Sequence, residues 1–399
     1  MSERGWIRGR GRRAVLLVGL FLLSFLIAST VYRERSSWAE PDRGFARPGL
    51  DVKNALPMVE PISGNAPLRV LSLDAGGIRG IIELHVLAFL EEQSGKPVSE
   101  LFDLFVGTST GSAITIGLLL PGEDGKPKFT AREMLVLYEE QVRTFSEVPW
   151  YHTLMTLDGW IGPRYSIGPS RDYAGRHYGD VPMGDLIGDV VVSTLDLETL
   201  EPRFLSSRQS RYPGGRAMPQ NFLAADVVMA CCAVPAYVPP MVLRDVHGKE
   251  AFVAVDGGAF AFAPATFALS EAINRHPGRR VTLLSLGTGM VEGGYTAEDA
   301  RSWGSIDWAS ASLPMVLRSQ VRYAEEVLAR TAATPDSILA NYLRLSPVIP
   351  AELERALATT PELIPRLGEI GEALVEARKD EIMAILEALD PPTPRDDLG

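Results

Sequence analysis

The chain contains two successive segments in which a short apolar run, a glycine-rich turn and an apolar helical pattern follow one another. The first covers residues 68–93 (LRVLSLD, AGGIRG, then a helical pattern), and the second covers residues 101–120 (LFDLFV, GTSTG, SAITIGLLL). Strands that are apolar almost throughout are buried on both faces, and their alternation with helices is typical of a parallel sheet between helical layers. The pattern therefore predicts an α/β sandwich with a mostly parallel central sheet.

Later apolar runs extend this pattern. Further strands are expected at residues 189–196, 251–255, 281–286 and 341–346, and apolar residues at helical spacing predict a helical cover for the sheet at residues 363–389. The 399 residues, 46% of them apolar, are enough for one large core or two moderate ones.

The N-terminal region has a different texture. Residues 14–32 (AVLLVGLFLLSFLIASTVY) carry no charge, and as a helix they would span about 28 Å, close to the thickness of a bilayer core. Residues 1–13 hold five arginines against one glutamate. This bias favours a single-pass anchor with a cytoplasmic N-terminus and a body on the opposite face, periplasmic in a bacterium. A cleaved signal, followed by secretion, and a buried core helix are the alternatives.

The chain is therefore expected to comprise five segments. These are a basic tip (1–13), a transmembrane or signal helix (14–32), a proline-rich linker or arm (33–67), one folded domain (68–389) whose helical cover begins near residue 300, and a tail (390–399).

Charge and cysteine usage exclude several classes of function. The formal net charge is −11 and the pI is about 5.1, which argues against nucleic acid as a partner because phosphate binding needs a basic face. Cys231 and Cys232 are the only cysteines, and the five histidines show no zinc-type spacing with them. No metal or other cofactor is expected.

Gly107-Thr108-Ser109-Thr110-Gly111 is a GxSxG motif between an expected buried strand and an apolar helix. This is the context of a nucleophile elbow, where a tight turn exposes the serine Oγ beside N–H groups at a helix N-terminus. A serine N-cap in a glycine turn is the simpler alternative.

The turn Asp74-Ala75-Gly76-Gly77-Ile78-Arg79-Gly80 supplies backbone N–H groups that little side-chain bulk shields. Such groups can stabilise a developing oxyanion in acyl transfer. A phosphate-binding loop is the competing interpretation, but the turn has neither GxGxxG spacing nor a GK[ST] lysine.

Asp256-Gly257-Gly258 follows the expected strand at residues 251–255. Strand ends are where α/β proteins place functional groups, and a carboxylate there could accept the serine proton. An ordinary turn is the alternative.

Together the three motifs resemble those of the patatin-like phospholipase family, calcium-independent lipid acyl hydrolases that use a Ser/Asp dyad on an α/β fold. DAGGIRG, GTSTG and DGG stand in the family's order and at compatible spacing, and further matches lie at residues 230–240 (ACCAVPAYVPP), 285–289 (SLGTG) and 342–345 (YLRL). The resemblance spans residues 68–389 and implies a three-layer sandwich.

The resemblance also implies roles for individual residues. Ser109 would be the nucleophile and Asp256 the base of a two-step acyl transfer. The implied oxyanion hole comprises Gly76, Gly77, Ile78, Arg79 and Gly80, and the supporting motif residues are Asp74, Gly107, Gly111, Gly257 and Gly258. The substrate would be a phospholipid or another lipid ester, and the anchor would keep the enzyme at a membrane.

Two departures from the family pattern leave alternatives open. Ala75 replaces a glycine, and Phe262-Ala263-Pro264 stands where the family often has Asn-Asn-Pro. A catalytically weak relative that binds lipid or a partner is therefore one alternative. The other is an esterase with a triad, because Ser109, Asp256 and His276 follow the chain order of α/β-hydrolases.

Residues 145–165 are rich in aromatic side chains, with Trp150, Tyr151 and Trp160 close together. Such a cluster fits a lipid interface, and ordinary packing is the alternative.

Overall fold

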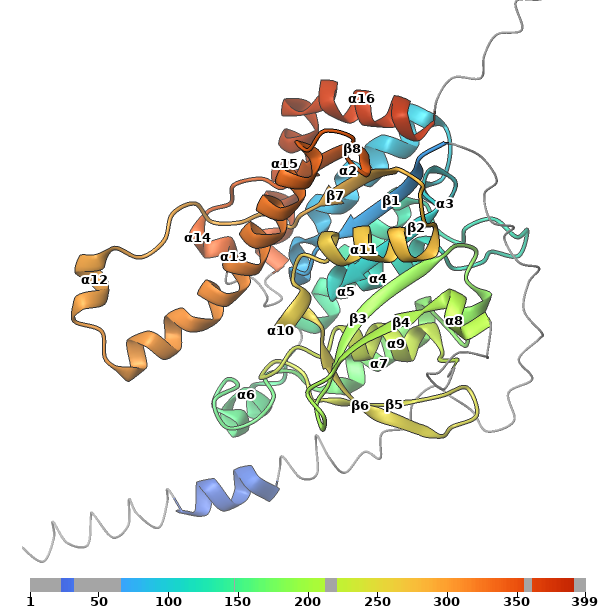
Figure 1. The fold of residues 1–399 in the computed structure, drawn as a ribbon. Coiled ribbons are helices and arrows are strands. Elements are labelled where there is room, and N and C mark those ends of the chain that lie inside the picture. Colours follow the sequence, from blue (N-terminus) through green and yellow to red (C-terminus); the bar gives the residue numbers. More distant parts are fainter. Residues whose placement is uncertain (1–22, 32–65, 147, 212–220, 355–360, 391–399) are drawn as a thin grey trace, which may run out of the picture.

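The computed structural model describes residues 23–31, 66–146, 148–211, 221–354 and 361–390. Its core is an eight-stranded sheet in the order β5-β6-β3-β2-β1-β7-β8, with β4 also paired to β3 (Figure 1). The strands are β1 (Leu68–Leu73), β2 (Leu104–Thr108), β3 (Val190–Asp196), β4 (Pro202–Ser206), β5 (Met241–Arg244), β6 (Glu250–Asp256), β7 (Val281–Leu286) and β8 (Leu339–Leu345).

The sheet is mixed, which corrects the expectation of a mostly parallel one. The neighbours β3, β2, β1, β7 and β8 run parallel, whereas β4, β5 and β6 form antiparallel pairs. The six expected strands are present, but sequence analysis missed β4 and β5. Both are short, and the side chains of β4 are mostly half-exposed or exposed, so neither produces a continuous apolar run.

Helices cover both faces of the sheet (Figure 1). They are α2 (Gly80–Ser94), α3 (Val98–Leu101), α4 (Thr110–Leu118), α5 (Ala131–Ser146), α6 (Trp150–Thr156), α7 (Ile167–His177), α8 (Ser207–Arg211), α9 (Ala224–Cys231), α10 (Gly258–Ala261), α11 (Ala265–Arg275), α12 (Ala297–Arg301), α13 (Ser305–Ala332), α14 (Ala351–Glu354), α15 (Ile364–Ala377) and α16 (Lys379–Leu389), with short 3-10 turns η2 (Gly77–Arg79), η3 (Met183–Asp185) and η4 (Pro361–Leu363).

Alternating strand residues pack into two separate cores, as expected for a three-layer sandwich. In β2, Phe105 joins the larger core under α2, α4, α5 and α9, whereas Val106 joins a smaller core under α11 and α13. The expected C-terminal cover consists of two helices, α15 and α16. The first packs on α2, and the second reaches β7 and β8.

The pairing of β3 brings the ends of two distant strands together. Residues 191–193 pair with both β2 and β4, so these strands lie on opposite edges of β3. Thr194 and Leu195 pair with both β4 and β6, so β6 lies on the same edge as β2. Thr108 is opposite Ser193 and Asp256 is opposite Thr194. The C-terminal residues of β2 and β6 are therefore neighbours along one edge of β3.

The expected membrane segment lies mostly outside the described residues. Its described part, residues 23–31, is helical. Among the described helices, none combines the length and the apolar character that a bilayer crossing requires. The anchor at residues 14–32 therefore stays a prediction, and the basic tip, nearly all of the linker and all but the first residue of the tail also lie outside the described residues.

Substituting Gly111 by alanine is expected to destabilise the fold. A Cβ there would lie 2.5 Å from the carbonyl oxygen of Leu73 in β1, an atom that cannot move without disturbing the sheet. We expect G111A to lower the free energy of unfolding by about 1–3 kcal/mol, measured from the midpoint of urea unfolding by circular dichroism. The control is G294A, because a Cβ added to Gly294 would have no heavy atom within 4 Å. Equal midpoints for the two variants would contradict this packing.

Candidate active site

Ser109 lies on a strained turn between β2 and α4. Its backbone has φ 53° and ψ −117° and the residue is the N-cap of α4, a conformation that side-chain-bearing residues rarely adopt. The turn is tight because Gly107 and Gly111 lie almost in contact, so that a Cβ on Gly107 would be 2.4 Å from the Gly111 carbonyl oxygen. The geometry agrees with the nucleophile elbow expected from the GxSxG motif.

The Ser109 hydroxyl donates a hydrogen bond of 2.5 Å to Oδ2 of Asp256. The other carboxylate oxygen, Oδ1, accepts the Gly258 N–H at 2.7 Å. Asp256 is the last residue of β6, and its own N–H donates to the carbonyl of Ala233 at 3.0 Å. The two residues proposed from sequence are thus in direct contact, although 147 positions separate them.

Burial raises the pKa of Asp256 to about 6, and the hydrogen bonds from Ser109 and Gly258 oppose that shift. A carboxylate with this pKa is ionised at neutral pH and is more basic than an ordinary aspartate. These are the properties that a general base at neutral pH requires.

The glycine-rich turn after β1 packs directly on the elbow. A Cβ on Gly80 would meet Oγ1 of Thr110 at 2.4 Å, so glycine allows the starts of α2 and α4 to approach. Within the described residues, no acceptor is recorded for the N–H groups of Gly76 and Gly77, whereas those of Arg79 and Gly80 bond to carbonyls of the turn itself. Among the described residues, Gly76, Gly77 and Ile78 are therefore the expected oxyanion donors whose N–H groups have no recorded acceptor.

The Arg79 side chain stabilises this turn. Its Nε donates to the carbonyl of Gly76 at 3.2 Å and its NH1 donates to that of Gly289 at 3.0 Å. Ala75, the first departure from the family pattern, is buried with Phe262 and Ala263. Its methyl group therefore packs against the aspartate loop.

Beside the turn lies a buried charged cluster that the sequence did not predict, although it marked Asp74 and the segment 342–345 that contains Arg344. Asp74 accepts a hydrogen bond from Arg344 at 2.6 Å, and Arg344 also contacts Glu325 and Ser285. The Asp74 N–H donates to Glu83 at 2.9 Å, and burial raises the pKa of Glu83 well above its usual value. The available signal for Glu83 is that it is the one acidic residue in the apolar stretch of residues 81–90.

The second departure, at Phe262, is accompanied by a contact from α13. The Phe262 N–H donates to Oε1 of Gln320 at 2.9 Å, and Nε2 of Gln320 donates to the carbonyl of Ala259 at 3.3 Å. A side-chain amide from a distant helix thus holds the loop after Asp256. No local pattern marks Gln320, because its partners lie about 60 residues away.

Cys232 is a further neighbour of the pair. Burial and the charge of Asp256 raise the pKa of its thiol, and a hydrogen bond with Ser109 opposes this shift. Cys231 and Cys232 are both free thiols. In the part of the chain that the structure describes, no group of three or more His, Cys, Asp or Glu side chains is arranged to hold a metal ion.

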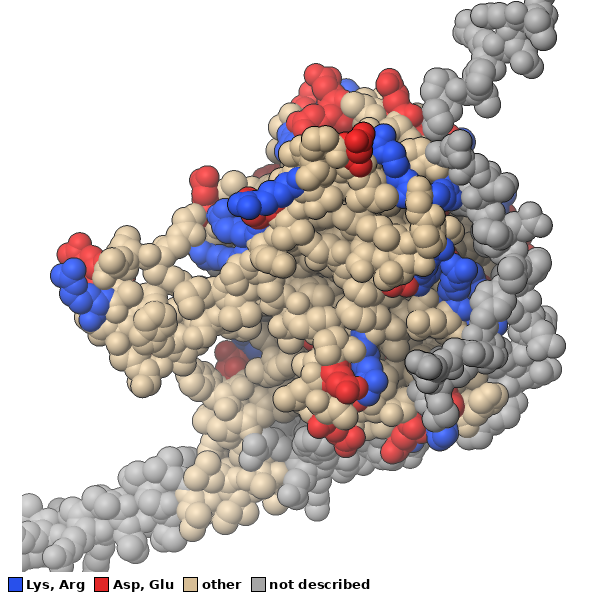
Figure 2. Space-filling model, viewed as in Figure 1, with Lys and Arg blue, Asp and Glu red and all other residues tan. Residues whose placement is uncertain are grey.

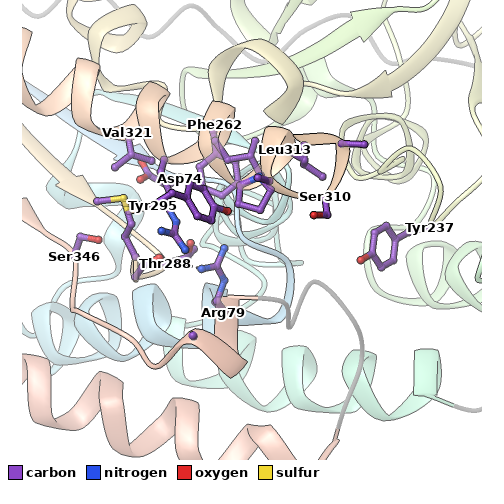
Figure 3. Close-up of a pocket in the computed structure, with 18 of the residues that line it drawn as sticks. Asp74, Arg79, Tyr237, Phe262, Thr288, Tyr295, Ser310, Leu313, Val321 and Ser346 are labelled. Carbon is purple, nitrogen blue, oxygen red and sulfur yellow. Dashed lines mark hydrogen bonds between the residues drawn. The ribbon is translucent and has the colours of Figure 1, made fainter. Parts of the chain in front are cut away.

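A cavity of about 840 Å³ opens beside these loops (Figure 3). Arg79, Phe262 and Thr288 form its inner wall. Ser109 and Asp256 are not among the lining residues, and only 5% of Ser109 is exposed. The cavity therefore reaches the turn and the aspartate loop, and Ser109 is buried outside its lining.

His276 does not belong to this site, so the alternative triad is wrong. It follows α11, and its charged neighbours are Arg279, Arg208, Arg275 and Asp189. Asp189 precedes β3, whereas Ser109 follows β2, and these strands are parallel. The histidine therefore lies near the N-terminal ends of these parallel strands, whereas the serine lies at their C-terminal ends.

The sequence of this chain matches known proteins over the region just described. A sequence model of the patatin-like phospholipase family matches residues 71–269, which include the glycine-rich turn, Ser109 and Asp256. The chain belongs to the patatin-like phospholipase family. Membership supports a lipid acyl hydrolase, a class that cleaves carboxylic esters.

Plant patatins are among the similar proteins. Patatin-like protein 2 of Arabidopsis thaliana is 29% identical over 279 residues, covering 63% of this chain and 67% of that protein. Patatin-like protein 1 of the same plant is 27% identical and covers 80% of this chain and 84% of its own length. Patatin group D-3 of Solanum tuberosum is 28% identical, with coverage of 80% and 87%.

Two solved structures resemble the chain more distantly. VipD from Legionella pneumophila gives a TM-score of 0.36 at 14% identity, covering 82% of this chain and 68% of its own. Human GIVD cytosolic phospholipase A2, in complex with methyl γ-linolenyl fluorophosphonate, gives 0.36 at 13% identity, and the match spans 60% of the human chain.

Replacing Asp256 by asparagine is expected to stabilise the protein at neutral pH. Because burial raises the pKa of Asp256, the unfolded chain releases this proton before the folded chain does as the pH rises from 3.8 to about 6. The free energy of unfolding therefore falls over this pH window. Above about pH 6 the total decrease is on the order of 3 kcal/mol. D256N removes this cost. We expect its urea midpoint to exceed that of the wild type at pH 8 and to match it at pH 4; a less stable variant at pH 8 would contradict the shifted pKa.

Proposed function

We propose that this protein hydrolyses lipid carboxylic esters, with phospholipids as the first substrate class, through a Ser109–Asp256 dyad and an acyl-enzyme. The observation that carries the proposal is the 2.5 Å hydrogen bond between a strained serine and a buried aspartate. Membership in the patatin-like phospholipase family supports the substrate class.

In the first step, Oγ of Ser109 attacks the ester carbonyl carbon while its proton passes to Oδ2 of Asp256. The carbonyl oxygen becomes negatively charged, and we infer that the N–H groups of Gly76 and Gly77 stabilise it. Collapse of the tetrahedral intermediate breaks the ester C–O bond. The proton on Asp256 then moves to the leaving alcohol oxygen, which is that of a lysophospholipid when the substrate is a phospholipid.

In the second step, water attacks the acyl-serine and gives its proton to Asp256. The second tetrahedral intermediate releases the fatty acid, and the proton returns to Oγ of Ser109. Ser109 is the N-cap of α4, where the helix dipole favours negative charge. The scheme needs one general base, and the pKa of Asp256 near 6 suits that role at neutral pH.

Membrane association is part of the proposal. Phospholipids reside in bilayers, and the uncharged segment at residues 14–32 is long enough to hold the domain beside one. The expected orientation keeps the N-terminus in the cytoplasm and the domain on the opposite face, with secretion after cleavage as the alternative.

The deciding experiment measures fatty-acid release from phosphatidylcholine vesicles by the full chain, with a metal chelator present. We expect S109A to lower kcat/KM by about 10³-fold or more, because no other group replaces the nucleophile. The control is S170A, which changes an equally buried serine on α7 and should retain full activity. A fluorophosphonate probe should label the wild type and S170A but not S109A. Absence of hydrolysis and labelling in the wild type would favour a catalytically weak lipid-binding relative.

The rate should also report the titration of Asp256. We expect kcat/KM of the wild type to rise with pH along a limb centred near pH 6, because the carboxylate must be ionised to accept the serine proton. D256N should remove this limb together with most of the activity. A limb that persists in D256N would show that another group is the base.

Gln320 is expected to act as a positioning residue for the aspartate loop. Q320A removes the contacts to Phe262 and Ala259, and we expect kcat to fall by about tenfold with little change in KM. The matched control on the same helix is S319A, since the Ser319 hydroxyl donates to the carbonyl of Val316 within α13. An unchanged kcat in Q320A, or an equal loss in S319A, would refute this role.

A further inference from the structure

Three segments that are distant in sequence lie on the same side of the molecule (Figure 1). Each of them has exposed apolar side chains. We call them together the apolar rim: residues 150–160 around α6, residues 295–316 from α12 and the first part of α13, and helical residues 23–31. The exposed rim residues are Leu23, Leu26, Ile27, Val31, Trp150, Tyr151, Leu154, Leu157, Trp160, Tyr295, Ile306, Trp308, Leu313, Met315 and Val316.

The α6 part of the rim is not ordinary packing. His152 and Thr156 are buried and attach the helix to the domain, whereas Trp150 is 76% exposed and Trp160 is 88% exposed. The helix therefore has one face against the protein and presents aromatic and aliphatic side chains to the outside. Exposed apolar groups gathered in this way mark an interaction surface.

The second part of the rim is a projecting arm. The first turns of α13 extend away from the sheet (Figure 1), and Ile306 there is 85% exposed. Edge-to-face contacts join Tyr295 to Trp303 at 4.8 Å and Trp303 to Trp308 at 5.0 Å between ring centroids. These contacts give the arm an aromatic cluster of its own. Figure 2 shows little charge on the arm beyond its tip.

The cavity beside the site lies between the arm and residues that follow the α6 part of the rim. Tyr295, Trp303 and Leu313 line it from the arm, and Arg164 and Tyr237 line it from the opposite side. Figure 2 shows the hollow between the arm and the protrusion that carries α6. Any flat surface that touches both parts of the rim therefore faces the cavity.

The third part of the rim lies against the first. The Ser29 hydroxyl donates a hydrogen bond of 2.5 Å to the carbonyl of Met155 in α6. Residues 23–31 carry no charge, and Leu26 and Ile27 are more than half exposed. An uncharged helical segment thus lies beside α6.

We propose that the apolar rim docks on the surface of a phospholipid bilayer and brings the cavity over the lipid that is to be hydrolysed. The inference rests on the proposed function, which supplies the occupant. Tryptophan and tyrosine beside aliphatic groups are typical of the bilayer interface. A protein partner that covered the arm and α6 together would close the cavity to substrate, whereas a bilayer supplies the substrate itself. The net charge of −11 makes attraction to anionic headgroups unfavourable, so docking is apolar and insensitive to salt.

The contact can be tested without catalysis. The full chain is labelled with an environment-sensitive dye at I306C and added to phosphatidylcholine vesicles that contain nitroxide lipids. The matched control is V136C, since Val136 on α5 is also exposed but lies outside the rim, and the unsubstituted chain reports labelling of Cys231 or Cys232. We expect quenching at position 306 to exceed that at 136 by about threefold or more, at low and at high salt.

Three results would overturn the proposal. They are equal quenching at the two positions, quenching lost at high salt, and a dye shift that depends on protein concentration without vesicles, which would make a second copy of the chain the occupant of the rim.

A second experiment measures activity. We expect W150S/I306S to lower fatty-acid release from vesicles by about tenfold through loss of apolar contact, with hydrolysis of a dissolved short-chain ester unchanged. V136S/Y323S, which changes two exposed side chains outside the rim, should leave both rates unchanged. Equal losses on both substrates, or no loss on vesicles, would refute docking through the rim. A wild type that hydrolyses neither substrate would refute the proposed function, and the quenching result would still decide docking.

Discussion

The site depends on one constraint, which is that β2 and β6 share a single edge of β3. Thr108 is opposite Ser193 and Asp256 is opposite Thr194, so the residue after β2 and the last residue of β6 must meet. Because β6 runs antiparallel to β3, its C-terminal residue faces back toward the end of β2. Gly257 makes this junction possible, since a Cβ there would lie 2.6 Å from the carbonyl oxygen of Ser193.

This junction leaves a carboxylate in an unfavourable environment. Asp256 is buried, and its carboxylate oxygens accept hydrogen bonds from Ser109 and Gly258. Burial disfavours the charged form and makes it more basic. The same environment therefore destabilises the fold at neutral pH and suits the aspartate to accept a proton, which is a common compromise at functional sites.

Helix α13 connects several parts of the site. Gln320 contacts the aspartate loop, and Glu325, about one turn further, contacts Arg344, which pairs with Asp74 beside the glycine-rich turn. The first turns of the same helix carry Ile306 and Trp308 in the apolar rim. One helix thus contacts both loops of the site and forms part of the surface around the cavity.

The sequence by itself determined the elements that local pattern can specify. Apolar runs predicted six of the eight strands, and the GxSxG and DGG motifs marked Ser109 and Asp256, because strands, turns and helix starts depend on nearby residues. Tertiary structure decided the mixed order of the sheet, the exclusion of His276, and the contacts of Gln320 and Glu83 with the loops of the site. These depend on contacts between distant residues such as Phe262 and Gln320. A single sequence carries no periodic signal for such contacts, because burial and strand register are properties of the whole packed chain.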